Sequence, residues 1–193
     1  VAALISYSAT YAATFFLSLF LQTVRGFPPE VTGFVLLAQP VVQAVISPVA
    51  GWLSDRASPR VVASLGIGID SVGFFLLSTT SIETDLWFII VILIIIGAGI
   101  ALFASPNTNA IMTSVERHHY GTASALVSTM RMLGQVLSMT IAMIIISTFA
   151  AAAQPGTSFV LAMQVAFLVF GVLCAVATVA SAARGKSNKA TPP

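Results

Sequence analysis

The chain has 193 residues, of which 58% are hydrophobic and only 7% are charged, and its formal net charge is +2. A soluble domain carries about 25% charged residues, so this composition excludes a soluble globular enzyme, a disordered chain and a nucleic-acid-binding protein. The single cysteine, Cys174, excludes a disulfide framework and a cysteine-based zinc site. A multi-pass membrane protein is the class that remains.

Charges, prolines and glycines divide the sequence into long apolar runs that predict transmembrane helices. The breaks fall at 25–30, 55–60, 78–85, 114–120 and 154–156. The last break is needed because one helix over 132–183 would be about 78 Å long, more than twice the hydrocarbon core. Since lipid tolerates no unpaired backbone groups, we predict an all-α polytopic membrane protein with six spans, at about residues 2–24, 31–54, 60–79, 86–113, 121–150 and 157–183.

Basic residues gather on one side of these predicted spans. One side consists of the loops at 55–60 and 114–120 and the tail 184–193, and its basic residues are Arg56, Arg60, Arg117, Arg184, Lys186 and Lys189. The loops on the opposite side contain one basic residue, Arg25. The positive-inside rule therefore predicts a cytoplasmic (inner) membrane location with both ends of the chain in the cytoplasm. The apolar start at Val1, without a basic leader, predicts that the chain is a piece of a longer protein.

The second predicted span ends in a tight, charged loop, Gly51-Trp52-Leu53-Ser54-Asp55-Arg56-Ala57-Ser58-Pro59-Arg60. Asp55 lies at a helix end, where a carboxylate can pair with a helix N-terminus. Arg56 and Arg60 can bridge to Glu116, which is predicted on the same side of the membrane. On charge alone, an equally good interpretation is a topology marker that contacts only water and lipid headgroups.

This loop resembles the signature loop of the major facilitator superfamily, G-x-L-x-D-R-x-G-R-R, which joins the second and third helices of each half. Ser58 and Pro59 replace the usual glycine and basic residue, and the matching residues are Gly51, Leu53, Asp55, Arg56 and Arg60. This weaker form is typical of the second-half copy of the loop. Residues 105–112, 120–124 and 130–135 are similar to the C-terminal half of drug:proton antiporters, especially the 14-spanner subfamily.

The resemblance implies that residues 1–183 form the C-terminal six-helix half of a transporter, with 184–193 as a cytoplasmic tail. It implies proton-coupled efflux of drug-like or amphipathic small molecules by alternating access, together with a missing N-terminal half, because substrate sites in this fold lie between halves. By resemblance, Asp55 would contact a helix N-terminus of that half. The expected partners are the lipid bilayer, a small-molecule substrate, protons and the N-terminal half, with no cofactor, metal or nucleic acid. Two alternatives stay open: a non-transporting half-protein or remnant, and a major facilitator transporter of another small organic solute.

Two charged residues, Asp70 and Arg131, fall about 10 residues, or about 15 Å, into their predicted spans. A charge at this depth is costly and commonly functional. Asp70 could carry protons or attract a cationic substrate, or it could be a structural group in an ion pair or hydrogen bond. By resemblance its helix lies away from the cavity, which argues against a substrate role, whereas Arg131 lies on a helix that faces the cavity. Their similar depth permits either a mutual pair or separate partners.

Neutral polar residues are concentrated on the first, second, fourth and fifth spans, which by resemblance line the cavity. Spacings of i, i+4 and i+7 put several of them on common helix faces, and the candidate lining residues are Tyr7, Tyr11, Gln39, Gln43, Asn107, Asn109 and Gln135. Interhelical hydrogen bonding is the competing interpretation. An apolar cleft with a few amides and hydroxyls suits amphipathic or aromatic compounds better than sugars or phosphates.

The placement of the histidines argues against an intramembrane enzyme. A serine protease needs a histidine base deep in the membrane beside its nucleophile, but His118 and His119 are adjacent in a predicted cytoplasmic loop. No G-x-S-x-G motif occurs. We expect the histidine pair to be solvated, without further metal ligands nearby.

Overall fold

The structure is a computed structural model that describes residues 2–150 and 157–183. Every regular element in these residues is a helix: α1 (Ala2–Leu19) with a π-helical extension η1 (Phe20–Val24), α2 (Pro29–Leu36), α3 (Ala38–Arg56), α4 (Pro59–Leu77), α5 (Leu86–Thr113), a 3-10 turn η2 (Arg117–His119), α6 (Tyr120–Ala150) and α7 (Thr157–Ala183). The predicted turn at 154–156 and the tail at 184–193 lie outside the described residues.

Six helical segments are long and apolar enough to cross a membrane: Ala2–Val24, Pro29–Arg56, Pro59–Leu77, Leu86–Thr113, Arg117–Phe149 and Ser158–Ser181. The second of these joins α2 and α3 through a turn residue, Leu37. The prediction of an all-α polytopic membrane protein with six spans is therefore confirmed.

Prolines and one glycine set where the early helices begin. Pro29 and Pro59 stand in the first turn of α2 and α4, where the N–H that proline lacks would have had no helical partner. Gly26 has φ of 68°, a left-handed conformation that glycine adopts at little cost, in the turn between the first two spans. The chain therefore reverses direction within a short loop.

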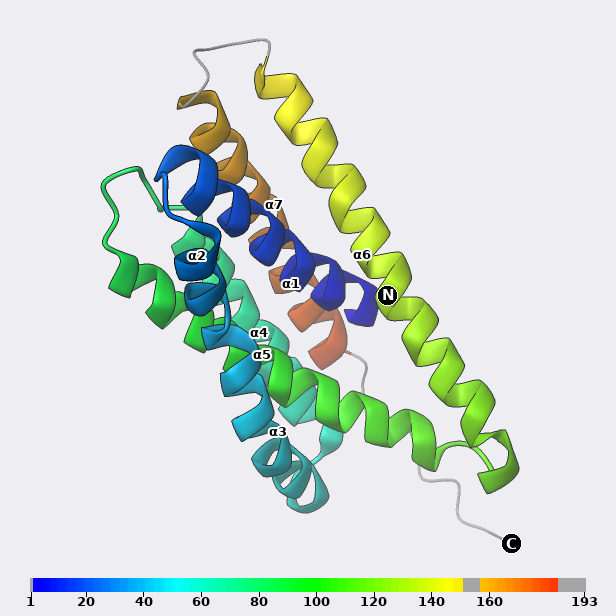
Figure 1. Cartoon of the computed structure of the whole chain (residues 1–193). Helices are drawn as coiled ribbons and strands as arrows, with labels where there is room; N and C mark the ends of the chain where they lie inside the picture. Colours follow the sequence, from blue (N-terminus) through cyan, green and yellow to red (C-terminus); the bar gives the residue numbers. More distant parts are fainter. Residues whose placement is uncertain (1, 151–156, 184–193) are drawn as a thin grey trace, which may run out of the picture.

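The helices form two groups that are joined at the back of the bundle. α1 packs on α6 and α7, α5 packs on α3 and α4, and α4 packs on α7. Figure 1 shows α6 and α2–α3 on opposite sides of α1, so the two groups diverge on the face in view. This divergence leaves α1 accessible along one side while its other side is buried.

An aromatic cluster fills the centre of the joined side. The fully buried rings of Phe16, Phe74, Phe167 and Phe170 lie on α1, α4 and α7. Ring centroids are 5.8 Å apart for Phe16 and Phe167 and 6.2 Å apart for Phe74 and Phe167. Edge-to-face and tilted contacts at these distances are favourable for aromatic pairs. The cluster therefore holds these three helices in one unit.

Glycines let α5 approach its neighbours at backbone distance. A Cβ on Gly66 of α4 would lie 2.6 Å from the carbonyl oxygen of Gly99, and one on Gly97 of α5 would lie 2.6 Å from that of Gln39 on α3. Because lipid is as apolar as the side chains, such close packing is a main source of helix association in a membrane. Gly97 also fixes the position of Gln39.

Candidate functional site

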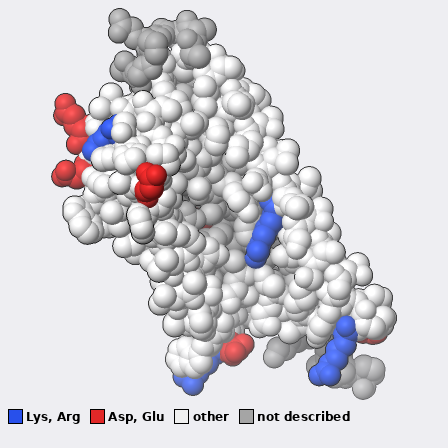
Figure 2. Space-filling view, in the orientation of Figure 1, with Lys and Arg blue, Asp and Glu red and all other residues white. Residues whose placement is uncertain are grey.

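A cavity of about 430 Å³ opens between α1, α2, α3 and α6 at mid-height of the bundle. Figure 2 shows this face hollowed near its centre, with an isolated basic group beside the hollow and the other charges near the two ends of the bundle. The lining residues are Tyr7, Thr10, Tyr11, Thr14, Gly33, Leu36, Leu37, Gln39, Pro40, Gln43, Ile100 and Arg131.

α1 contributes one face to the cavity, because Tyr7, Thr10, Tyr11 and Thr14 follow the spacing i, i+3, i+4, i+7. The hydroxyl of Thr10 donates to the carbonyl oxygen of Ser6 at 2.9 Å, and that of Thr14 donates to Thr10 at 3.3 Å. The threonine hydroxyl protons are thus engaged by their own helix. The Tyr7 side chain is 5% exposed and its hydroxyl is buried, so Tyr11 and the residues opposite it are the polar groups left to meet a ligand.

The second span contains a proline where it borders the cavity. Helical hydrogen bonds continue through the turn residue Leu37, from its N–H to Gly33 and from Val41 to its carbonyl, but Pro40 has no N–H with which to bond the carbonyl of Leu36. Gln39 is buried and Gln43 is half-buried, and both line the cavity from α3. Two amides therefore lie on this wall.

Arg131 lines the cavity from α6 and its position follows from close packing on α1. A Cβ on Gly134 would lie 3.1 Å from the Cβ of Tyr7, and the hydroxyl of Ser8 donates to the Gly134 carbonyl at 2.9 Å. This approach brings the guanidinium carbon of Arg131 to 5.2 Å from the centre of the Tyr7 ring. The contact is a cation–π interaction.

Asp70 of α4 is buried where α4 packs on α5, and it contacts α1 through Ser6. Its side chain is 1% exposed, and its Oδ2 accepts from the hydroxyl of Ser6 at 3.3 Å. A Cβ on Gly99 of α5 would overlap the carboxyl group, so this glycine provides the space for it. Asp70 and Arg131 thus have separate partners, and no ion pair joins them in the described residues.

The sequence candidates divide into two sets. Tyr7, Tyr11, Gln39 and Gln43 come together at the cavity, whereas the remaining three do not line it: Asn107, Asn109 and Gln135. The two asparagines follow Pro106 in the last turns of α5, near the loop that contains η2, and Gln135 is exposed one turn beyond Arg131. Polar character alone could not have distinguished these positions, because it does not report which way a helix face points.

The signature loop connects α3 to α4. Gly51 lies close to α5, where a Cβ would be 3.4 Å from the Ser105 hydroxyl, and the guanidinium of Arg56 lies 3.9 Å from the centre of the Trp52 ring. Leu53 is half-buried, while Asp55 and Arg60 are exposed at the surface. Within the described residues, neither arginine forms an ion pair with Glu116, and its role as a charge partner stays a prediction.

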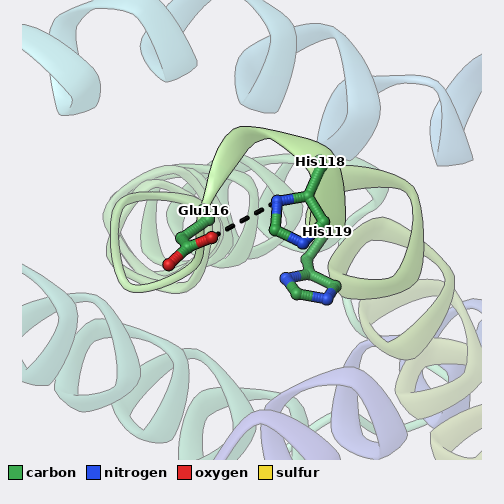
Figure 3. Close-up of side chains that lie close together, drawn as sticks. All are labelled: Glu116, His118 and His119. Atoms are coloured by element: carbon green, nitrogen blue, oxygen red, sulfur yellow. Dashed lines mark ion pairs between the residues drawn. The ribbon is translucent and has the colours of Figure 1, made fainter.

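Glu116 instead forms a local pair, which Figure 3 shows. Its Oε2 lies 3.3 Å from Nδ1 of His118, because η2 turns the chain back within three residues. The ligand atoms of Glu116, His118 and His119 all lie within 4.8 Å of one another. The expectation that no further ligand lies near the histidines is therefore wrong. All three side chains are exposed, and apart from the Glu116 contact with His118 no hydrogen bond from the described residues orients the rings, as metal ligands usually require.

A bundle of six membrane-crossing helices with a polar-lined cavity at mid-height defines a multi-pass membrane protein of the kind that handles small molecules. Its family follows from comparison of the sequence. The chain belongs to the Major Facilitator Superfamily, whose family model matches residues 1–192.

Three relatives illustrate the range of the family that this chain resembles. It is 37% identical over 130 residues to the Uncharacterized transporter YebQ of Escherichia coli (strain K12), covering 67% of this chain and 28% of the relative. It is 31% identical over 133 residues to the Multidrug resistance protein Stp of Mycobacterium tuberculosis, covering 69% of this chain and 25% of the relative. It is 26% identical over 131 residues to the Riboflavin transporter RibZ of Clostridioides difficile, covering 68% of this chain and 29% of the relative.

The fold is also similar to that of a solved structure described as "Structural insights into substrate recognition in proton dependent oligopeptide transporters". The TM-score is 0.77 at 22% sequence identity, and the match covers 99% of this chain and 42% of that chain. At this identity the likeness concerns the fold alone. The matched regions span less than a third of the length of the curated relatives.

Proposed function

We propose that this chain is the C-terminal six-helix half of a secondary active transporter that exports drug-like or amphipathic small molecules in exchange for protons. A second, N-terminal half closes the cavity from the other side, and the substrate reaches it from each side of the membrane in turn. The observation that carries the proposal is the cavity of about 430 Å³, where hydroxyl, amide and guanidinium groups interrupt an apolar wall. Cavities of this size and lining suit drug-sized ligands.

Two underpacked spans support the existence of a partner half. In the spans Pro29–Arg56 and Arg117–Phe149, only 17% of the apolar membrane-crossing stretch is buried within the bundle. The corresponding share for Ala2–Val24 is 56%. Both spans contribute residues to the cavity, and they lie on either side of α1 (Figure 1), so a second helical unit that packs on both would cover the cavity from outside. Lipid would then cover the outward faces of the bundle.

The proposed location is the cytoplasmic membrane, with both ends of the chain in the cytoplasm. The charges of the described residues gather at the two ends of the bundle (Figure 2), and the basic excess lies at the end that carries Arg56, Arg60 and Arg117. The positive-inside rule supports the cytoplasmic assignment of that end.

Transport of another small organic solute is the second candidate function. The similarity to the riboflavin transporter of Clostridioides difficile motivates it, because that relative is named for one solute and not for drug resistance. The two candidates differ in breadth of substrate, since a drug exporter accepts several unrelated structures. A panel of compounds therefore separates them.

The decisive experiment measures efflux of a panel of dyes and antibiotics, with riboflavin included, from cells that express the full-length gene. The comparison is made with and without a protonophore. We expect energy-dependent efflux of several panel members that the protonophore abolishes. Efflux that persists in the protonophore would remove the antiport proposal, and efflux of riboflavin alone would favour the second candidate.

Filling the cavity should block transport without harming the fold. Gly33 lines the cavity, and a Cβ there meets no atom within 4 Å. We predict that Gly33→Phe lowers the efflux rate by about tenfold or more, because the ring occupies the space of the substrate. The measurement is initial efflux rate normalised to membrane protein level.

The control for this variant is Val176→Phe, which adds a ring on the exposed outer face of α7. Its rate should match that of the unmodified transporter. An unchanged rate in Gly33→Phe would show that substrate does not pass through this cavity.

A further inference from the structure

Arg131 is a cation placed near the middle of a membrane-crossing segment. It lies within Arg117–Phe149, about 20 Å along the helix from the first residue of that segment. A charged side chain at this depth is costly and is normally paired with an opposite charge or a backbone carbonyl. The guanidinium of Arg131 therefore needs a group that neutralises it.

The surroundings of Arg131 contain no anion in the described residues. The cavity lining contributes tyrosine, threonine and glutamine side chains but no carboxylate. Asp70, the acidic residue buried within the bundle, is 1% exposed, accepts a hydrogen bond from Ser6 and does not line the cavity. The ion pair found among the described residues joins Glu116 and His118, in the exposed loop before α6.

Tyr7 positions the guanidinium without neutralising it. The ring lies 5.2 Å from the guanidinium carbon and is itself held by an edge contact with Phe103, at 6.2 Å between centroids. A cation–π contact uses the face of the ring and leaves N–H donors of the guanidinium available. Those donors match the two oxygens of a carboxylate in a bidentate pair.

We infer that Arg131 binds an acidic group of the transported molecule, so that the substrates of this cavity are amphipathic compounds with an aromatic or apolar body and one carboxylate. The inference rests on the proposed function and narrows it to a substrate class. Tyr11 contacts the aromatic body, and the amides of Gln39 and Gln43 contact its polar substituents across the cavity. The cavity volume of about 430 Å³ admits such a body.

The test uses two probes that differ in charge and share a body, pyrenebutanoic acid and pyrenebutanamide. Their binding to the purified full-length transporter is measured by fluorescence, and their transport is measured in proteoliposomes. We expect the acid to bind more tightly than the amide. Arg131→Gln should weaken binding of the acid by at least about tenfold, as loss of a charged hydrogen-bonded pair predicts, and change binding of the amide less than about twofold.

Two further variants separate charge from structure. Arg131→Lys keeps the charge but not the bidentate geometry, so it should recover part of the affinity for the acid. Arg117→Gln removes an exposed arginine of η2 and should leave both probes unaffected. Thermal unfolding of each variant shows whether the protein is intact.

Three results would overturn the inference. Equal loss of the acid and the amide in Arg131→Gln would mean that the guanidinium pairs with a group of the protein instead. Unchanged binding of the acid would mean that the guanidinium does not contact the ligand, and tighter binding of a cationic probe, pyrenebutyl-trimethylammonium, would reverse the substrate class. A different result separates the two claims. If the acid binds through Arg131 but no transport occurs, the proposed transport function is contradicted, whereas the recognition of a carboxylate by Arg131 is not.

Discussion

At the scale of single residues, two glycines of α4 differ in what surrounds them. A Cβ on Gly66 would lie 2.6 Å from both the Gly99 oxygen and the Phe103 nitrogen, which are backbone atoms of α5. A Cβ on Gly68 would lie 3.6 Å from the methyl group of Thr178, an ordinary van der Waals distance. The same chemical change is therefore costly at one position and tolerated at the other.

We predict that Gly66→Ala destabilises the full-length protein by about 1–3 kcal/mol, because α4 and α5 must separate to admit the methyl group. Gly68→Ala is the matched control and should leave the midpoint of thermal unfolding in detergent unchanged or slightly higher, since alanine favours the helix. Similar midpoints for the two variants would contradict the close packing of α4 on α5.

At the scale of elements, Arg25 ties together two loops at the end of the bundle away from the α3–α4 loop. Its Nη1 donates to the carbonyl oxygens of Ile82 at 2.6 Å and Thr84 at 2.7 Å. The guanidinium also lies 5.6 Å from the centre of the Phe27 ring. One side chain thereby joins the turn after the first span to the loop before α5.

We predict that Arg25→Ala lowers stability by about 1–2 kcal/mol, with the loss limited because water can reach the freed carbonyl groups. Hydrogen exchange of the amides in 79–85 should accelerate, while the exchange of amides in α4 and α5 stays near that of the unmodified protein. Arg117→Ala, at an exposed position without a hydrogen bond in the described residues, serves as the control. Unchanged exchange in 79–85 would argue that the hydrogen bonds of Arg25 do not hold this loop in place.

At the scale of the whole molecule, the exposed end of α3 is a surface through which the chain could contact the proposed other half. Asp55 is exposed there and has no ion-pair partner in the described residues, whereas Arg56 is held by Trp52. A carboxylate in this position can hold a helix N-terminus of the proposed other half, which would stabilise one access state. The role of Asp55 would then concern transport and not insertion.

We predict that Asp55→Asn reduces transport several-fold while membrane insertion stays close to normal. The two quantities are measured together, as transport rate and as membrane-fraction blots of the full-length protein. Asp55→Glu, which keeps the charge, should retain more transport than the amide variant. Parallel loss of transport and of membrane protein would show a folding defect instead.

The sequence by itself determined the class of protein and its six spans. Long apolar runs must become helices in lipid, because every backbone group needs a partner there, and the charged segments mark where the spans stop. The loop with Asp55 and Arg56 also indicated the family, because its residues follow a fixed pattern. These conclusions depend on local composition and spacing, which sequence reports directly.

Only the tertiary structure decided which polar groups meet. It placed Tyr7, Gln39 and Arg131 around one cavity and left Asn107 and Gln135 outside it. It also paired Glu116 with His118 instead of an arginine, and Asp70 with Ser6 instead of Arg131. The physical reason is that the direction of a helix face is set by contacts with distant segments, such as Gly134 against Tyr7, which no local pattern contains.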